Sequence, residues 1–232
     1  MNPALRRSAA HVFVETLQHP ELVEGDAHHL LRVMRLRDGE HVSVSDGNGS
    51  WRMCTIATSG NLVPETAIQS DHSQRSILTI AVALPKNNRP EWIVQKLTEI
   101  GIDQVQFLET ERSIVRWDSA RSARNVRKLQ TVAREAAMQS RRIWLPTINE
   151  PLDLLTFMRT QSANSFASAA EPDGDAISAG VRTVLIGPEG GWTLEELTKI
   201  GRRITLGENI LRVETAALVA ATQMVALGHG RW

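Results

Sequence analysis

Residues 183–215 read TVLIGPEGGWTLEELTKIGRRITLGENILRVET, and this stretch contains the same local pattern twice. Each copy has an apolar segment, a glycine-led loop and the start of a predicted helix. The first copy runs from Thr183 to a helix that opens at Thr193, and the second runs from Ile204 to a helix near Glu214. Ligands of open α/β sheets bind at the carboxyl ends of the strands, where such loops lie. This pair of loops is therefore the candidate active site.

The first loop, residues 187–191, has three glycines among its five residues, which permits close backbone approach to a ligand. Thr193 and Glu196 fit the capping-box pattern at the start of a helix. Phosphate-binding loops also end at helix N-termini, but neither the Walker pattern nor Gly-x-Gly-x-x-Gly is present. Nearby carboxylates would repel a polyphosphate. They are Glu189, Glu195, Glu196, Glu208 and Glu214.

An acidic, glycine-rich pocket suits a ligand that combines an apolar ring, hydroxyl groups and positive charge. S-adenosylmethionine, with its sulfonium and ammonium groups, is such a ligand. The residues alone leave a second interpretation open, in which these are two ordinary strand-to-helix turns without a ligand.

Composition and length predict a soluble globular protein of one large domain or two smaller ones. The chain has 232 residues, of which 42% are hydrophobic and 22% charged. It has no long apolar run and no signal-peptide pattern, so we expect neither export nor membrane insertion. Cys54 is the only cysteine, which excludes an intrachain disulfide and fits the reducing cytoplasm. The adjacent His28 and His29 lack metal-ligand spacing, and we expect no metal site.

Basic residues concentrate in one part of an otherwise neutral chain. Lysine plus arginine and aspartate plus glutamate both number 26, so the net charge does not indicate nucleic-acid binding. Between Arg112 and Arg142, however, lie nine basic residues and only two acids, Asp118 and Glu135. Such a run is usually a solvated helix face, but beside a catalytic site it is also suited to binding phosphates.

The N-terminal residues, 1–72, read as short strands joined by tight turns. Strands are predicted at 11–15 and 41–45, with hairpin signals at Asp38-Gly39 and Asp46–Gly49. Several short strands at this spacing are typical of a β-barrel. Residues 28–36 (HHLLRVMRL) are predicted to form one helix that carries Arg32 and Arg35.

After a polar linker at 70–76, strands and helices alternate, which predicts a parallel α/β sheet. We expect strands at 77–84, 105–108, between Pro146 and Pro151, at 165–169, 183–186 and 204–206. We expect helices that begin near Pro90, Asp118 (to Ser140), residue 152, Thr193 and Thr215 (to Leu227). The rest of residues 162–180 is predicted to be a flexible loop because it is rich in Ser, Ala, Asp and Gly.

The sequences GPEGGWTLEE (187–196) and LGENILRVETAAL (206–218) resemble the signature pair of the SPOUT-class RNA methyltransferases. The chain is most similar to the ribosomal RNA small-subunit methyltransferase E family. Further matches are Lys86–Arg89, KLTEIG at 96–101 and EAAMQS at 135–140, so the resemblance covers essentially the whole chain. Trp192 stands where the family more often has Phe or Leu, and Ile100 where Leu is usual; both are apolar exchanges.

The resemblance implies a fold, a cofactor and partners. The implied fold is α/β, with a trefoil-knotted, SPOUT-type parallel-sheet methyltransferase domain at 77–232 and a PUA-like β-barrel at 1–72 that helps to bind RNA. The implied reaction is S-adenosyl-L-methionine-dependent methylation of N3 of a uridine in 16S ribosomal RNA. The substrate is 16S rRNA or the small ribosomal subunit, and the protein is expected to be a cytoplasmic homodimer without a membrane anchor or a metal.

The resemblance also assigns candidate residues. For catalysis, Arg212 would stabilise the anion left when N3 loses its proton, and Glu189 and Glu214 are candidates for the base or for cofactor contacts. The expected cofactor contacts are Ile186, Gly187, Pro188, Glu189, Gly190, Gly191, Leu206, Gly207, Asn209, Ile210, Leu211, Arg212 and Thr215. The expected RNA contacts are Arg6, Arg7, Arg32, Arg35, Arg112, Arg121, Arg124, Lys128 and Arg142.

Two other functions remain open at this point. The chain is also compatible with a SPOUT enzyme that modifies another rRNA position or a tRNA. It is compatible as well with a non-catalytic RNA-binding or ribosome-assembly factor that keeps the fold but does not bind S-adenosylmethionine.

Overall fold

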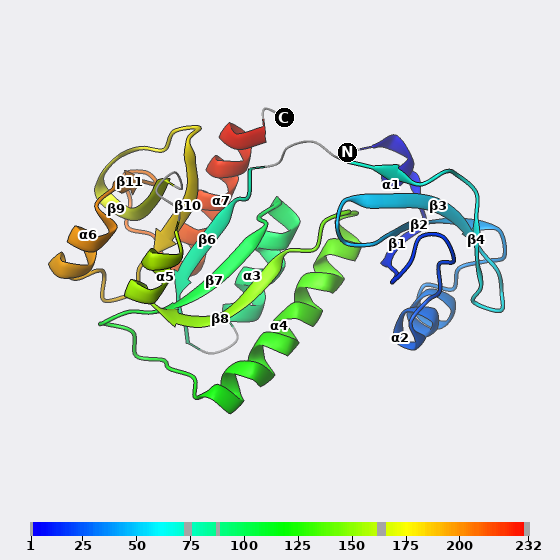
Figure 1. Ribbon diagram of the computed structural model, residues 1–232, viewed down its shortest axis with the longest axis horizontal. Helices are drawn as coiled ribbons and strands as arrows, with labels where there is room; N and C mark the ends of the chain where they lie inside the picture. The colour runs from blue at the N-terminus through cyan, green and yellow to red at the C-terminus, as the bar shows by residue number, and fades with distance from the viewer. Residues whose placement is uncertain (1, 72–75, 87–88, 162–165, 230–232) are drawn as a thin grey trace. The chain divides into compact units, whose positions relative to one another are not determined.

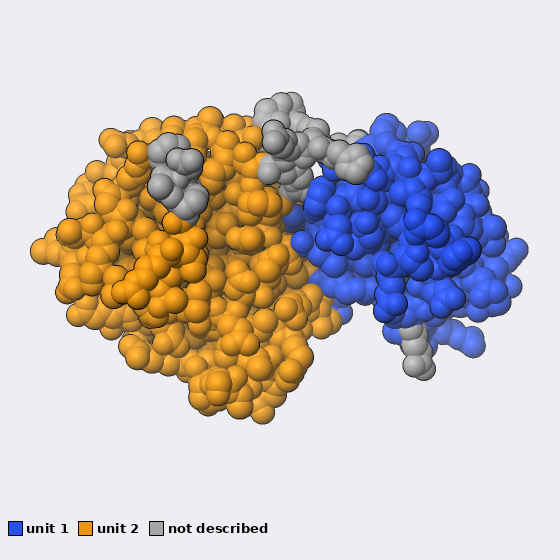
Figure 2. All heavy atoms as spheres, viewed as in Figure 1, with its two compact units in different colours: residues 1–74, 134–145 blue, residues 75–133, 146–232 orange. Residues whose placement is uncertain are grey.

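The computed structural model describes residues 2–71, 76–86, 89–161 and 166–229. Their contacts divide the chain into two compact units, which are shown in blue and orange in Figure 2. Unit 1 contains residues 1–74 and 134–145, and unit 2 contains residues 75–133 and 146–232. The predicted linker at 70–76 falls largely on residues 72–75, which lie outside the described residues.

Unit 1 is built on a small, mainly antiparallel sheet with the order β1-β2-β3-β4, in which β5 also pairs with β3. The sequence predicted the β2–β3 hairpin, and Asp46–Gly49 does connect these two strands. Asp38-Gly39, by contrast, is a turn ahead of β2, and the strand before it pairs with β2 in parallel. The strands are β1 (Ala10–Phe13), β2 (Glu40–Ser45), β3 (Ser50–Ile56), β4 (Leu62–Pro64) and β5 (Gln69–Ser70).

The helical segments of unit 1 differ from the prediction of one helix at 28–36, which was wrong. The chain forms α2 (Glu24–His28) and continues as a π-helical turn, η1 (His29–Val33). It leaves the helix before Arg35, whose φ of 57° lies in the left-handed region. Hydrophobic periodicity indicated that Leu30 is buried, but it could not indicate the left-handed backbone at Arg35. A further short helix, α1 (Pro3–Arg7), begins at an Asn2 cap.

Residues 134–145, from the end of a long helix onward, pack within unit 1. Arg134 makes a two-pronged ion pair with Asp26, with N–O distances of 2.9 and 2.5 Å. The indole of Trp144 lies against Gly49, where a Cβ would come within 2.1 Å of the ring. Arg134 belongs to the basic run between Arg112 and Arg142, which is usually a solvated helix face, whereas in the structure this side chain is bonded to Asp26.

The buried His11 should make the stability of unit 1 depend on pH. The side chain is 2% exposed, and its ring nitrogens lie 2.8 Å from Ser43 Oγ and 2.9 Å from the Arg142 carbonyl. Burial lowers the pKa of His11 to about 4, against the hydrogen bond to Arg142 and with the help of Arg141. In the unfolded chain this ring binds a proton near pH 6.5, whereas in the folded chain it stays neutral down to about pH 4. The free energy of unfolding therefore falls as pH decreases from about 6.5 towards 4.

We expect His11 to account for a loss of about 2 kcal/mol in the free energy of unfolding between pH 7 and pH 5. Urea unfolding of the wild type and of His11→Gln at both pH values measures this, because the variant lacks the titrating ring. If both proteins lose the same amount, His11 is not responsible.

Unit 2 is a six-stranded sheet with the order β11-β9-β10-β6-β7-β8, and every adjacent pair is parallel (Figure 1). The prediction of a parallel α/β sheet is thus confirmed. Its strands are β6 (Thr79–Ala83), β7 (Gln104–Glu109), β8 (Thr147–Asp153), β9 (Phe166–Ala176), β10 (Val181–Ile186) and β11 (Arg203–Thr205).

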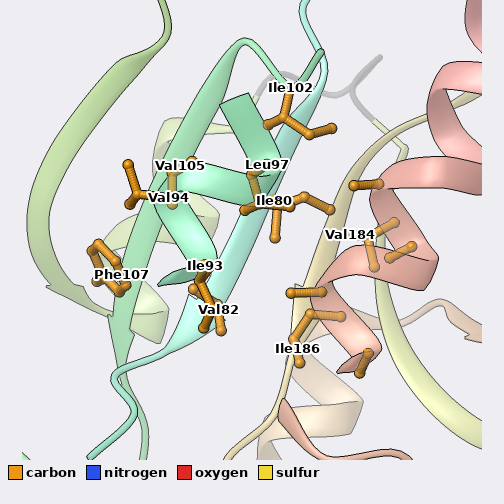
Figure 3. Close-up of a cluster of buried hydrophobic side chains, with 14 of the residues drawn as sticks. Ile80, Val82, Ile93, Val94, Leu97, Ile102, Val105, Phe107, Val184 and Ile186 are labelled. Carbon is orange, nitrogen blue, oxygen red and sulfur yellow. The ribbon is translucent and has the colours of Figure 1, made fainter. Parts of the chain in front are cut away.

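Helices cover both faces of this sheet because alternate strand residues point to opposite sides. Ile80 and Val82 of β6 pack in one apolar cluster with Ile93, Val94 and Leu97 of α3 (Figure 3), and residues of α4 and α7 belong to the same cluster. The intervening Ala81 joins a second cluster with residues of α5 and α6. The helices are α3 (Arg89–Ile100), α4 (Ser119–Gln139), α5 (Leu154–Thr160), α6 (Leu194–Ile200) and α7 (Val213–His229). None of the helices formed by the described residues is long and apolar enough to span a membrane.

Two strands of unit 2 extend beyond their predicted limits. Pro151 was expected to bound the strand before α5, but it lies within β8, which is the edge strand. A proline without an N–H is tolerated at such an edge. Residues 170–176 were expected to be loop, but they belong to β9, which pairs with both β10 and β11. The predicted loop residues 162–165 lie outside the described residues.

Candidate active site

The two glycine-led loops line one cavity of about 460 Å³ in unit 2. The first loop follows β10, and the second follows β11. Strand β9 lies between these two strands, so the loops face each other across its end. Of the residues expected to contact a cofactor, all except Gly190 and Thr215 line the cavity.

The third wall of the cavity comes from β9 and was not predicted. Ala169 pairs with Arg203, but the next pair along β11 is Ile204 with Asp175, so residues 170–174 leave the ladder and rejoin it. Ala170, Glu171 and Pro172 of this excursion line the cavity. The composition of the segment gave only a loop signal, because Pro, Asp and Gly are poor strand formers.

Glu171 brings a carboxyl group to this wall. Burial raises the pKa of Glu171, the nearby Asp173 raises it further, and Arg203 lowers it. Arg203 also pairs with Asp173 at 2.8 Å. The cavity therefore has carboxyl groups from two sides, Glu171 on β9 and Glu189 on the first loop.

The first loop is held from both ends. Gly187 lies against Trp192, and a Cβ at this glycine would come within 2.9 Å of the indole Nε1. At the far end, the predicted capping box is confirmed, with Thr193 and Glu196 bonding each other's backbone N–H groups. Glu196 also accepts a hydrogen bond from the N–H of Glu111 at 2.9 Å. The loop is thereby tied to the segment that follows β7.

Arg112 has a different position from the one expected of an RNA contact. Its guanidinium donates to the carbonyl of Gly190 at 2.9 Å and to that of Trp192 at 3.3 Å. The side chain thus braces the glycine loop from outside the cavity. No local pattern signals this contact, because 78 residues separate Arg112 from Gly190.

The candidate catalytic carboxylates meet at one arginine. Arg89, at the start of α3, donates to Glu189 at 3.0 Å and lies 3.7 Å from Glu214 Oε2. That Glu214 oxygen is buried and has no hydrogen-bond partner in the described structure. Arg212 lines the cavity and is exposed, and its guanidinium makes no ion pair within the part of the chain that the structure describes.

The candidate RNA contacts are divided between the units. Five of them are in unit 1: Arg6 and Arg7 on α1, Arg32 on η1, Arg35 and Arg142. In unit 2, Arg121 and Lys128 of α4 line a second cavity, whereas Arg124 of the same helix does not. Lys128 also pairs with Glu91 at 2.6 Å. Among the described residues, no group of three or more His, Cys, Asp or Glu side chains is arranged to hold a metal ion.

Comparisons with known proteins agree with this architecture. Residues 72–225 match the RNA methyltransferase domain family, and residues 24–62 match the RNA methyltransferase PUA domain family. A ribosomal RNA small subunit methyltransferase E from Mycobacterium bovis is 30% identical over 91% of this chain and 87% of its own.

Solved structures show the same fold. A probable rRNA-methyltransferase from Porphyromonas gingivalis is 28% identical, with a TM-score of 0.79 over 94% of this chain and 98% of its own. A ribosomal RNA small subunit methyltransferase E from Neisseria gonorrhoeae, solved bound to S-adenosyl methionine, is 24% identical, with a TM-score of 0.80 over 94% of this chain and 98% of its own.

Proposed function

The chain belongs to the ribosomal RNA small subunit methyltransferase E family, and on this premise we propose that it transfers a methyl group from S-adenosylmethionine to N3 of a uridine in 16S rRNA. The observation that carries the proposal is the single cavity shared by the two glycine-led loops. A non-catalytic factor has no need of such a cavity, and the retained loop pair favours the enzyme.

The residues that line the cavity fit S-adenosylmethionine. Ile186, Leu206 and Leu211 supply apolar contacts for an adenine ring, and the loops bring backbone polar groups close to the ligand. Glu171 and Glu189 can face the ligand's positive charges. Glu214, in the first turn of α7, is not among the residues that line the cavity, but its buried Oε2 accepts no hydrogen bond in the described structure and is a further candidate acceptor. When bound, this cofactor supplies an electrophilic methyl group.

The protein's own residues must then prepare the uracil. N3 lies on the Watson–Crick edge, so the base has to be unpaired or flipped before it reaches the cavity. N3 also carries a proton that must leave, and in this proposal Arg212, which lines the cavity, stabilises the resulting negative charge. Glu189 or Glu214 takes the proton in this proposal, with Arg89 holding both carboxylates in place.

Two measurements test the proposed function. Calorimetry with S-adenosylmethionine should show binding to the purified protein. Nucleoside mass spectrometry of 16S rRNA incubated with protein and cofactor should show new 3-methyluridine. A methyl group on another nucleoside would show that the protein is a methyltransferase with a different target. The absence of cofactor binding would favour a ribosome-assembly factor.

Arg112→Ala should weaken S-adenosylmethionine binding about fivefold, because it removes the hydrogen bonds that brace Gly190 and Trp192, worth about 1 kcal/mol in net terms. Calorimetry checks this loss. Arg124→Ala is the matched control, since Arg124 is exposed on α4 and lines neither cavity. Equal affinities for the two variants would contradict the bracing role.

Family resemblance and charge support the remaining assignments in the proposal. Residues 1–72 form the RNA-binding PUA-like domain, and residues 77–232 form the knotted methyltransferase domain. Arg6, Arg7, Arg32 and Arg35 contact RNA phosphates from the first domain, and so does Arg142, which belongs to the same compact unit. The protein acts in the cytoplasm as a homodimer, which sedimentation velocity can test through the measured mass.

A further inference from the structure

A second cavity, of about 560 Å³, lies in unit 2 at the carboxyl ends of β6 and β7. Its walls come from Lys86 after β6, the start of α3, residues 114–117 after β7, and one face of α4. We propose that this cavity holds a nucleotide that neighbours the target uridine in the same RNA strand. The inference rests on the proposed function, because it assigns a second subsite to the same substrate.

The charge of the cavity suits a phosphodiester. Lys86, Arg116, Arg121 and Lys128 line it, together with a single acid, Glu91. Glu91 is already paired with Lys128 at 2.6 Å. Within the described ranges, Lys86, Arg116 and Arg121 have no carboxylate partner. Three cations around one hollow, none of them in an ion pair with another described residue, attract a polyanion.

The apolar part of the cavity distinguishes a nucleotide from a bare anion. Trp117 lines it and its ring packs against that of the buried Phe107, with ring centroids 6.0 Å apart. Ile114 also lines the cavity and is 76% exposed, so it offers apolar surface there. Aromatic and apolar surfaces next to cations are the usual surroundings of an unstacked base and its phosphate.

The sheet places this cavity beside the cofactor cavity. Strands β10, β6 and β7 are consecutive and parallel, so their carboxyl ends share one edge. Neighbouring strands lie about 4.8 Å apart, which puts β7 roughly 10 Å from β10. Arg89 reaches Glu189 of the first cavity, and the next residues, Pro90 and Glu91, line the second. An RNA strand that follows this edge meets both cavities.

Binding measurements test the subsite. The double variant Arg116→Ala/Arg121→Ala should bind a single-stranded 16S rRNA fragment that contains the target uridine on the order of tenfold more weakly. The slope of log K against log salt should fall by about 1.4, because each phosphate contact to a single strand contributes about 0.7. The control, Arg127→Ala/Arg159→Ala, removes two exposed arginines that line neither cavity. Equal losses in both variants would overturn the proposal.

Photo-crosslinking locates the nucleotide directly. In the wild-type protein, 4-thiouridine placed next to the target uridine should crosslink to the tryptic peptide Trp117–Arg121. Crosslinks that all fall outside residues 114–128 would overturn the subsite. Neither experiment needs methyl transfer. If the wild type binds no S-adenosylmethionine, the proposed function fails. If it methylates rRNA, but the double variant loses no more RNA affinity than the control and the crosslinks fall outside residues 114–128, only the subsite fails.

Discussion

Arg212→Ala is expected to lower the rate of methyl transfer about 100- to 1,000-fold, which is the usual effect of removing one donor that stabilises a developing anion. Arg212 lines the cofactor cavity and is exposed there. Two other basic residues beside the first loop are already engaged, Arg89 by Glu189 and Arg112 by the carbonyls of Gly190 and Trp192. Among the described residues, no second guanidinium lines the cavity to replace Arg212. Single-turnover transfer at saturating cofactor and RNA measures the change.

Two further measurements distinguish a role of Arg212 in the chemical step from a role in ligand binding alone. Arg212→Lys, which keeps the charge, should recover part of the rate. The deficit of Arg212→Ala should also shrink as pH rises, because more uracil is then deprotonated by the solvent. An unchanged single-turnover rate with weaker cofactor or RNA affinity would show that Arg212 binds ligand and does not assist the chemistry.

Gly174→Ala is expected to destabilise unit 2 by about 3 kcal/mol, at the upper end of the usual cost of overpacking. A Cβ at this position would lie 2.4 Å from the carbonyl carbon of Ile204 and 2.5 Å from its nitrogen. Both contacts are backbone atoms, so no side chain can turn away to relieve them. Strands β9 and β11 must separate instead, and β11 leads into the second loop.

Urea unfolding gives the stability change, and calorimetry should show weaker S-adenosylmethionine binding at the same time. Gly25→Ala is the matched control, because a Cβ at Gly25 meets nothing within 4 Å and its φ is not in the left-handed range. Wild-type stability and affinity in Gly174→Ala would mean that β9 and β11 are not packed as described.

Local signals predicted much of the fold. The capping box at Thr193 and the buried strand β6 depend on neighbouring residues, and both are found where the sequence placed them. The prediction for 28–36 was wrong because hydrophobic spacing does not report φ, and Arg35 takes a left-handed conformation. The prediction ended β9 at residue 169 because residues 171–175 have poor strand propensity, and local sequence could not show that Asp175 and Ala176 return to the sheet by pairing with β11.

The site was predictable only where its residues are contiguous. Both loops carry their own glycine signal, and they meet at one cavity. Other features of the site depend on residues far apart in sequence. They are the position of β9 between the two loops, the hydrogen bond from Arg112 to Gly190 and the ion pair of Arg89 with Glu189. Arg134 shows the same limit, because a helix-face count cannot reveal a buried partner such as Asp26.

The excursion of β9 at residues 170–174 has an evolutionary consequence. Register is fixed on both sides of it, by Ala169 with Arg203 and by Asp175 with Ile204. Residues 170–173 can therefore be exchanged without shifting the sheet or either glycine loop, whereas Gly174 has to stay because it packs against the backbone of Ile204. Members of a lineage can reshape the pocket at this one border, and a directed-evolution library aimed at unnatural cofactor analogues should randomise 170–173 while keeping Gly174.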